Sequence, residues 1–407
     1  MTATLGGPGP VLAPEQVRRF VRAQVAGLDL AGRSLCVVIP DGTRRCPLPA
    51  LLQAVADGVG DRVRSWTAVV ALGTHAPMSD DAIGFLVGPV ALRARNHAWW
   101  DDDTFVHVGR LPAELVHDLS GGKLDDAIDV RINRLVVESD VALIVGPVLP
   151  HEVIGFSGGN KYLFPGLSGR EMIDVTHWLG ALITSSEIIG TRGVTPVRAL
   201  VNAAAELVPG ERHALCVVVD HDTGGVQALS FGDPARAWAA AADVAAETHI
   251  TYLDAPVERV LSLIPARYPD LWTGAKGFYK VEPVVADGGE VVLYAPHIRE
   301  IAAMHPRIGE IGYHCRDFIL AQWDRYRGVP AGELAHSTHL FGAGTYDHET
   351  GEHQRVRVTL ATGIPEEVVR SANLGYLAPD AVDRDGWASD PGTLVVPDAG
   401  EVLYRLR

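Results

Sequence analysis

Residues 34–45 read SLCVVIPDGTRR and contain the unit from which the fold is predicted. The apolar, β-branched run Ser34–Ile39 has the length of a strand, and the polar segment Asp41–Arg45 follows it after one proline. Leu48–Gly58 then has the apolar spacing of an amphipathic helix. Apolar strands that alternate with helices are typical of a largely parallel sheet covered on both faces.

The same alternation continues along the chain in two series. In the first we predict strands at Trp66–Ala71, Arg134–Glu138, Val141–Val145 and Ala214–Val219, and helices at Pro14–Ala26, Asp80–Leu86, Met172–Ser185, Pro196–Leu207 and Pro234–Thr248. In the second we predict strands at Val257–Ile264, Glu290–Ala295, Arg355–Ala361 and Gly392–Val396, and helices at Asp270–Val285 and Arg316–Arg325.

This pattern predicts an α/β protein of two domains with largely parallel sheets. We place an N-terminal cofactor-binding domain at residues 1–255 and a C-terminal domain at residues 256–407. Ligands of open α/β sheets bind beyond the carboxyl ends of the strands or between domains. The active site is therefore expected in the interdomain cleft.

Composition excludes several classes of partner. The 407 residues are 47% hydrophobic and 21% charged, as in an ordinary globular enzyme, and the net charge is −15. Nucleic acids and anionic membrane surfaces need basic patches, so we expect neither as a partner. Apolar runs are too short to span a membrane, no secretory signal is recognisable, and the four cysteines form no CxxC pair. A cytoplasmic protein is expected.

Polar residues follow the first two predicted strands. Asp41, Thr43 and Arg44 suit a ribose or a substrate carboxylate, because a guanidinium binds a carboxylate through two hydrogen bonds. The alternative is a plain Asp-Gly turn with solvated arginines. The loop GTHAPMS, residues 73–79, brings His75 to the equivalent place after the second strand. A structural or solvated histidine is the alternative there.

The segment HEVIGFSGGNKYLFPGLSGREMIDVTH, residues 151–177, is the richest in chemistry. The turn Ser157-Gly158-Gly159 lets backbone N–H groups approach an anion, and Lys161 can neutralise phosphate or act as an amine nucleophile. His151 and His177 suit a proton shuttle and a metal ligand. The spacing of neither a Walker loop nor a dinucleotide-binding loop is present. For His177 the alternative is a histidine at the edge of the core.

Two later residues are weaker candidates. Lys276 lies in LWTGAKGF, residues 271–278, where a surface lysine is the alternative. Trp323 follows Gln322 in a predicted apolar helix, where a core residue is the alternative. His305, His314 and His348 show no metal-binding spacing and receive no role.

Together these motifs resemble the lactate racemase family, whose enzymes use a nickel-pincer nucleotide. The resemblance runs from about residue 36 to residue 325. The matching motifs, in chain order, are Asp41-x-Thr43-Arg44, Gly73–Met78, His151, Ser157–Gly159, Lys161, His177, Lys276 and Gln322-Trp323.

The resemblance implies a cofactor, pyridinium-3-thioamide-5-thiocarboxylic acid mononucleotide, that holds nickel between two sulfur-bearing arms. Lys161 matches the lysine that bonds covalently to one arm, and His177 matches the protein ligand of nickel. By the same resemblance the remaining positions have these roles: His75 and His151 are catalytic; Arg44, Lys276 and Trp323 bind substrate; Asp41, Thr43, Ser157, Gly158 and Gly159 contact the cofactor.

The implied reaction is racemisation or epimerisation of a 2-hydroxy acid by reversible hydride transfer, with enzymes of cofactor biosynthesis as partners for loading. Two bases on opposite sides of the substrate are required, and two histidines meet that need. Gly42 and Thr273 stand where the lactate enzymes commonly have histidine and glutamine, so a larger 2-hydroxy acid or a sugar acid is an equal candidate. The alternatives are another redox or elimination step on a hydroxy acid, or a non-catalytic binding protein.

Overall fold

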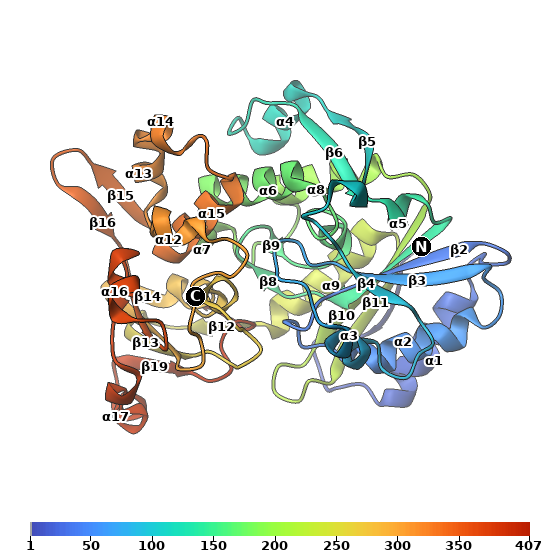
Figure 1. Ribbon diagram of the computed structural model, residues 1–407. Helices are drawn as coiled ribbons and strands as arrows, with labels where there is room; N and C mark the ends of the chain where they lie inside the picture. Colours follow the sequence, from blue (N-terminus) through green and yellow to red (C-terminus); the bar gives the residue numbers. More distant parts are fainter. Residues whose placement is uncertain (1) are drawn as a thin grey trace. The chain divides into compact units, whose positions relative to one another are not determined.

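The computed structural model describes residues 2–407, which form two compact units (Figure 1). Unit 1 contains the chain up to Leu149 together with Phe156–Ile173 and Arg192–Thr248. Unit 2 contains Pro150–Gly155, Asp174–Thr191 and His249–Arg407. Because two short segments before residue 192 belong to unit 2, the units interleave along the chain. The division into domains 1–255 and 256–407 stays a prediction.

A seven-stranded sheet forms the centre of unit 1, in the order β1-β11-β10-β7-β2-β3-β4. Strands β10, β7, β2, β3 and β4 are parallel, whereas β11 is antiparallel to both of its neighbours. The strand bounds are β1 (Ala3–Gly6), β2 (Ser34–Ile39), β3 (Ser65–Val70), β4 (Ala94–Asn96), β7 (Val141–Pro147), β10 (Glu211–Val219) and β11 (Val226–Gly232).

Both faces of this sheet are covered. Successive side chains of a strand point to opposite faces, and every residue of β2 and β7 is buried. The helices of unit 1 are α1 (Pro14–Ala26), α2 (Leu48–Val59), α3 (Asp80–Val87), α4 (Ala113–Ser120), α5 (Arg134–Val137), α8 (Pro196–Glu206) and α9 (Pro234–Thr248), with the short 3-10 helices η1 (Asp102–Thr104) and η2 (Gly159–Tyr162). An antiparallel hairpin, β5 (Phe105–Leu111) and β6 (Ile128–Asn133), completes the unit.

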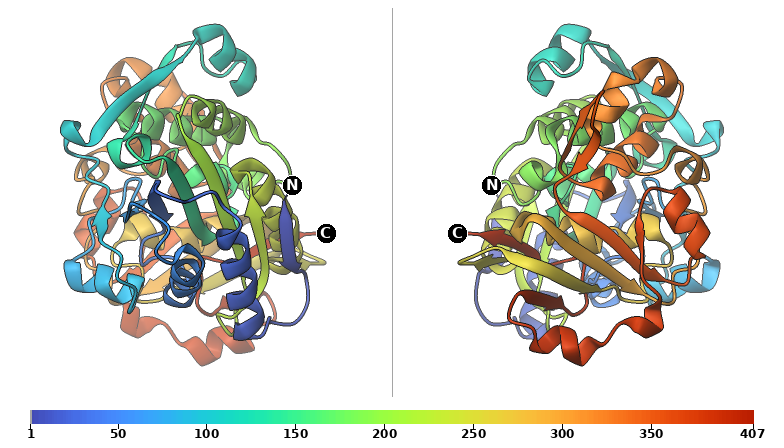
Figure 2. Two further views of the ribbon diagram at one scale, coloured as in Figure 1. Left: turned by 90° about the vertical axis from the view of Figure 1, so that its right-hand side faces the viewer. Right: turned by 90° about the vertical axis from the view of Figure 1, so that its left-hand side faces the viewer.

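Unit 2 has a five-stranded, wholly parallel sheet in the order β18-β17-β14-β13-β19, visible in the right-hand view of Figure 2. Its strands are β13 (Val257–Leu263), β14 (Val285–Ala295), β17 (Arg357–Thr362), β18 (Gly375–Tyr376) and β19 (Thr393–Val396). Further strands are β8 (Pro150–His151), the parallel pair β12 (Ile250–Leu253) and β20 (Leu403–Leu406), and the hairpin β15 (Gly344–Asp347) and β16 (Gly351–Gln354). Strand β9 (Gly155–Phe156) ends where the chain re-enters unit 1.

The helices of unit 2 are short. They are α7 (Ser185–Ile188), α10 (Leu271–Gly274), α11 (Lys276–Tyr279), α12 (Arg307–Ile311), α13 (Arg316–Ala321), α14 (Trp323–Tyr326), α15 (Ala331–Phe341), α16 (Glu366–Ser371) and α17 (Arg384–Ser389), with η3 (Glu282–Val284) and η4 (Pro379–Ala381). Helix α6 (Arg170–Ile183) begins in unit 1 and continues into unit 2. Within residues 2–407, no helix has the length and apolar character needed to cross a membrane.

The α/β class and the largely parallel sheets are confirmed, and three predicted elements are wrong. Arg134–Glu138 is not a strand, because the Asn133 side chain accepts a hydrogen bond from the Leu135 N–H and starts a helical turn. The helix predicted at Asp270–Val285 is divided into α10, α11 and η3. The helix predicted at Arg316–Arg325 breaks at Gln322, whose φ of −116° and ψ of 31° are not helical.

Leu143 lies in the middle of β7 and is fully buried. The change Leu143→Ala is expected to lower the free energy of unfolding by about 2–5 kcal/mol, because it removes buried apolar surface and leaves a cavity. Urea unfolding measures the loss. The matched control Leu115→Ala, on α4 at 38% exposure, is expected to change it by less than about 0.5 kcal/mol. Equal losses would contradict the assignment of β7 to the core.

Candidate functional site

The loops that follow β2 and β3 bring Asp41 and His75 into direct contact. These strands are parallel neighbours, so their carboxyl ends lie at the same edge of the sheet. The Asp41 carboxylate, through Oδ2, is hydrogen-bonded to Nδ1 of His75. Its other oxygen, Oδ1, accepts from the Thr43 N–H at 3.0 Å and from the Thr43 hydroxyl at 2.5 Å. Both oxygens of this buried carboxylate are therefore fixed.

Asp41 is ionised in this setting. Burial raises the pKa of its carboxyl, but the charges of His75 and Arg44 and the hydrogen bonds of His75 and Thr43 outweigh burial and hold that pKa well below its usual range. Asp41, Thr43, Arg44 and His75 thus form one group, as expected from two neighbouring strand ends. The two alternatives from the sequence, a solvated Asp-Gly turn and an isolated loop histidine, do not fit this arrangement.

The loop Ser157-Gly158-Gly159 has a backbone that only glycine accommodates. Gly158 and Gly159 have φ values of +87° and +56°, in the left-handed region. A Cβ on Gly158 would lie 2.5 Å from Cγ2 of Val148, and one on Gly159 would lie 2.7 Å from Cβ of Trp238. The loop is therefore closely packed, and it leads into η2, which contains Lys161.

A buried arginine and a tryptophan hold this loop from behind. Arg198, which is fully buried, donates to the carbonyl oxygens of Phe156 and Gly158 and stacks on the Trp238 ring, with 4.1 Å between its Cζ and the ring centroid. Trp238 Nε1 donates to the Ser157 carbonyl at 2.9 Å. Burial lowers the pKa of Arg198 to about 9, which leaves it charged at neutral pH. The loop carbonyls are engaged on this side, so the loop is fixed before any ligand binds.

His151 lies in β8, shortly after the end of β7, and is buried within unit 2. Its Nδ1 accepts the Val153 N–H at 3.2 Å and lies 3.6 Å from Oε2 of Glu152. The amine of Lys280, also buried, donates to the carbonyl of Pro150. The histidine is thus attached to a strand whose backbone is itself held by a buried cation.

His177 lies on α6 and is partly exposed. The neighbouring Trp178 stacks on Trp323, with ring centroids 5.6 Å apart and planes 21° apart. Trp323 is 40% exposed, so its interpretation as a core residue is wrong. The ring on which Trp323 stacks, Trp178, directly follows His177 in the chain.

Lys276 is buried on α11, which excludes the surface-lysine alternative. One turn earlier, on α10, Trp272 lies between two imidazoles in a stack of three rings. Its ring centroid is 4.0 Å from that of His305 and 4.1 Å from that of His336. The Lys276 amine itself lies 5.6 Å from the centroid of the Tyr268 ring.

Helix α15 contributes two histidines that the sequence interpretation missed. Tyr279 and Tyr313 each place a hydroxyl 3.3 Å from a ring nitrogen of His336. His339 Nδ1 lies 2.5 Å from the Ser185 hydroxyl. Burial lowers the pKa of His339 to about 4 and that of His336 well below its usual value, so both are neutral. The i, i+3 spacing of His336 and His339 was the available signal.

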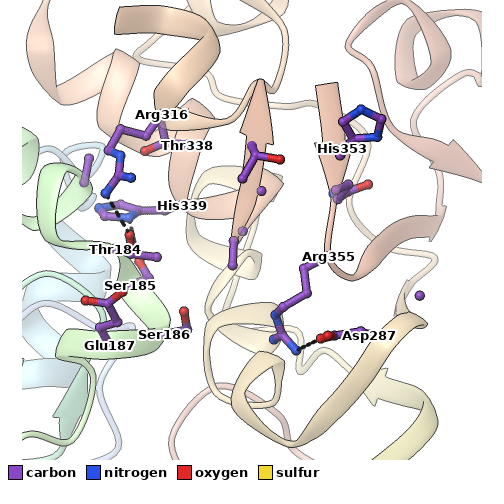
Figure 3. A pocket seen from close by; sticks show the side chains of 17 residues that line it. Thr184, Ser185, Ser186, Glu187, Asp287, Arg316, Thr338, His339, His353 and Arg355 are labelled. Carbon is purple, nitrogen blue, oxygen red and sulfur yellow. Dashed lines mark hydrogen bonds and ion pairs between the residues drawn. The ribbon is translucent and has the colours of Figure 1, made fainter. Parts of the chain in front are cut away.

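A pocket of about 510 Å³ opens in unit 2 next to the Ser185–His339 pair (Figure 3). Arg316 and Thr184 lie on one side of it, and Arg355 pairs with Asp287 on another. Thr184 has a φ of 99°, which is rare for a residue other than glycine. Two arginines, Arg316 and Arg355, and two carboxylates, Glu187 and Asp287, line the pocket, so its formal charges balance.

The comparisons with known proteins agree with these motifs. Residues 21–190 match the lactate racemase N-terminal domain, and the chain is similar to the lactate racemase of Thermoanaerobacterium thermosaccharolyticum, with 24% identity over 272 residues. Residues 21–190 thus carry the lactate racemase N-terminal domain, and the chain is similar to lactate racemases.

A second lactate racemase is similar to the chain over a shorter region. The lactate racemase of Lactiplantibacillus plantarum is 28% identical over 152 residues. The alignment with the Lactiplantibacillus enzyme covers 35% of this chain and 32% of that enzyme. The alignment with the Thermoanaerobacterium enzyme covers 65% of this chain and 60% of that enzyme.

Two solved structures share the fold. A Thermotoga maritima protein, 29% identical, has a TM-score of 0.91 over 99% of this chain and 100% of its own. The lactate racemase apoprotein of Thermoanaerobacterium thermosaccharolyticum, 18% identical, has a TM-score of 0.70 over the same shares of the two chains.

The family residues fall into two sets. Unit 1 holds Asp41, Thr43, Arg44, His75, Ser157, Gly158, Gly159 and Lys161; unit 2 holds His151, His177, Lys276 and Trp323. Their roles, and a site that combines both sets in an interdomain cleft, stay predictions. Across the described part of the chain, no group of three His, Cys, Asp or Glu residues could hold a metal ion by itself.

The change Gly158→Ala tests the packing of the loop. We expect it to destabilise the protein more than Gly193→Ala does. Both glycines have a positive φ, +87° and +83°, so both alanines carry a backbone strain of about 1–3 kcal/mol. Only the Cβ at residue 158 would collide with Val148, whereas nothing lies within 4 Å at residue 193. Urea unfolding compares the two variants, and equal losses would contradict a closely packed loop.

The change Asp41→Asn tests the ion pair through its pH dependence. A carboxyl with a depressed pKa stabilises the fold above its unfolded pKa and loses that effect as pH falls through the folded pKa. At pH 7 we expect the variant to unfold about 1–3 kcal/mol more easily than the wild type, with the difference shrinking below about pH 4. Urea unfolding across pH measures this. Asp61→Asn, at an exposed position, should show no such trend.

Proposed function

We propose that this protein is a racemase or epimerase that inverts the hydroxyl-bearing carbon of a 2-hydroxy acid by reversible hydride transfer, with a nickel-pincer nucleotide as cofactor. The observation that carries the proposal is the His75–Asp41 pair at neighbouring strand ends, in a chain that carries the lactate racemase N-terminal domain. An imidazole with one nitrogen on a carboxylate keeps its other nitrogen for proton transfer. Arg44 and Lys276, which also match the family motifs, supply positive charges for the carboxylate of a hydroxy acid.

Stereoinversion of a 2-hydroxy acid requires that hydrogen leave one face of the carbon and return to the other. The α-hydrogen is too weakly acidic for easy removal as a proton. The bound cofactor would supply a hydride acceptor, so that no carbanion is needed. His75 would take the hydroxyl proton while the hydrogen leaves, and His151 would serve as the second acid–base group.

The substrate carboxylate needs a cationic partner while the carbonyl group turns. Arg44 suits this role, because a guanidinium binds a carboxylate through two hydrogen bonds and keeps its charge at any physiological pH. Lys276 brings a second cation, buried at 4% exposure and held beside the Trp272 stack. Fixing the substrate in this way lowers the entropy loss on reaching the transition state.

The residues fit the cofactor. The closely packed loop at Gly158 and Gly159 leads directly into η2, so the backbone of Lys161 is held in place, which suits covalent attachment of its amine to a thioamide arm. His177, partly exposed on α6, would be the protein ligand of nickel. The chain offers no complete ligand set around it among residues 2–407, and soft sulfur donors from the cofactor would complete the coordination.

The substrate is lactate, a larger 2-hydroxy acid or a sugar acid, and enzymes of cofactor biosynthesis are the expected partners for loading. A cytoplasmic location, without nucleic acid or membrane partners, remains part of this proposal. The net charge of −15 supports the absence of nucleic acid.

Co-expression with the cofactor-biosynthesis enzymes tests the proposal. We expect stoichiometric nickel and a gain in intact mass that Lys161→Ala abolishes, while Lys123→Ala, at an exposed position, retains it. Chiral chromatography should then show racemisation of an enantiopure 2-hydroxy acid. His75→Asn and His151→Asn should each lower kcat/KM about 100-fold or more. Folded protein with neither nickel nor added mass would overturn the proposal.

A further inference from the structure

We propose that Glu152 is a positioning residue for His151, the counterpart of Asp41 beside His75, and that the two histidines rest in opposite tautomers. The part that Glu152 and the two tautomers play in catalysis rests on the proposed function. The tautomers themselves follow from the hydrogen bonds of each histidine within its own unit.

His75 carries its proton on Nδ1. A carboxylate can only accept, and Asp41, which is ionised, is bonded to that nitrogen. Thr43 occupies the other carboxylate oxygen, so Asp41 cannot turn away without losing two hydrogen bonds. When neutral, His75 therefore presents a lone pair on Nε2 and is ready to accept a proton.

His151 has the opposite arrangement. A backbone N–H can only donate, and the Val153 N–H points at Nδ1 of His151 from 3.2 Å. That nitrogen must hold a lone pair, so the proton of the neutral ring is on Nε2. At rest, one histidine offers an acceptor and the other offers a donor.

A racemase must work in both directions, so His151 must also hold a second proton. With Nδ1 protonated, its N–H would face the Val153 N–H, and the two donors would repel each other. Oε2 of Glu152, 3.6 Å from Nδ1, is placed to accept that proton's hydrogen bond after a small rotation of the ring. Glu152 is buried, at 7% exposure, so water competes little for this role.

Other titratable groups surround this pair. Lys280 donates to the carbonyl of Pro150, directly before His151. Burial raises the pKa of Tyr279, and the charge of Glu152 raises it further. Burial lowers the pKa of His339, whereas Glu152 opposes that change. The charge of Glu152 thus shifts the pKa of more than one buried group in unit 2. Without that charge, the cation of Lys280 would remain next to His151.

The test is ¹⁵N NMR of the histidine rings in protein purified without cofactor or substrate. In the wild type above pH 8 we expect His75 in the Nδ1–H form and His151 in the Nε2–H form. On acidification, the Nδ1–H resonance of protonated His151 should be observed with the wild type and with Glu152→Asp, and should be lost to exchange with Glu152→Gln. Asp41→Asn should alter His75 alone. Glu349→Gln, at an exposed site in unit 2, should alter neither.

A His151 spectrum that Glu152→Gln leaves unchanged would overturn the proposal, as would a resting Nδ1–H form of His151. These spectra require no turnover, so they stand apart from the racemase proposal. In the cofactor-loaded enzyme, Glu152→Gln should also change the pH profile of kcat/KM, with Glu152→Asp restoring most of it. A purely structural role would lower activity equally at every pH.

Discussion

The parallel pairing of β2 with β3 and β7 is the constraint on which the site in unit 1 depends. Three adjacent parallel strands end at one edge of the sheet, and the chain leaves β2 and β3 in polar loops. The strands are apolar on both faces because helices cover both, so functional groups can lie only at the strand ends. Asp41 and His75, separated by 34 positions in sequence, meet for this reason.

The loop with Gly158 and Gly159 depends on a different kind of support. Its backbone has positive φ values that glycine adopts without strain, and Arg198 and Trp238 hold it through carbonyl oxygens, a ring stack and an indole hydrogen bond. Burying a guanidinium completely costs desolvation free energy, which two hydrogen bonds to backbone carbonyls and the stack on Trp238 offset in part. Such rigidity suits the cofactor-attachment role that we propose for Lys161.

Unit 2 combines an ordinary parallel sheet with an unusually polar interior. Hydrogen bonds and ring stacks replace part of the hydration of its buried polar groups, whereas Oε2 of Glu282 and Nε2 of His339 have no hydrogen-bond partner within residues 2–407. The buried groups are Lys276, Lys280, Glu282 and the histidines of α15. Burial keeps His336 and His339 neutral, so they act as hydrogen-bonding groups rather than as cations. This polar interior gives Glu152 and His151 a setting in which small displacements exchange one hydrogen bond for another.

The sequence by itself determined the α/β class, most strands of the two parallel sheets, and the motifs that mark the lactate racemase family. Those features depend on local apolar periodicity and on short-range spacing. Only the tertiary structure decided the rest. Arg134–Val137 became helical through the cap at Asn133, and Lys276 is buried, whereas the sequence left a surface lysine as the alternative. The partners of Asp41, of His151 and of the α15 histidines come from contacts between distant segments. Side-chain packing in the folded protein determines those contacts, and apolar periodicity along the sequence does not encode them.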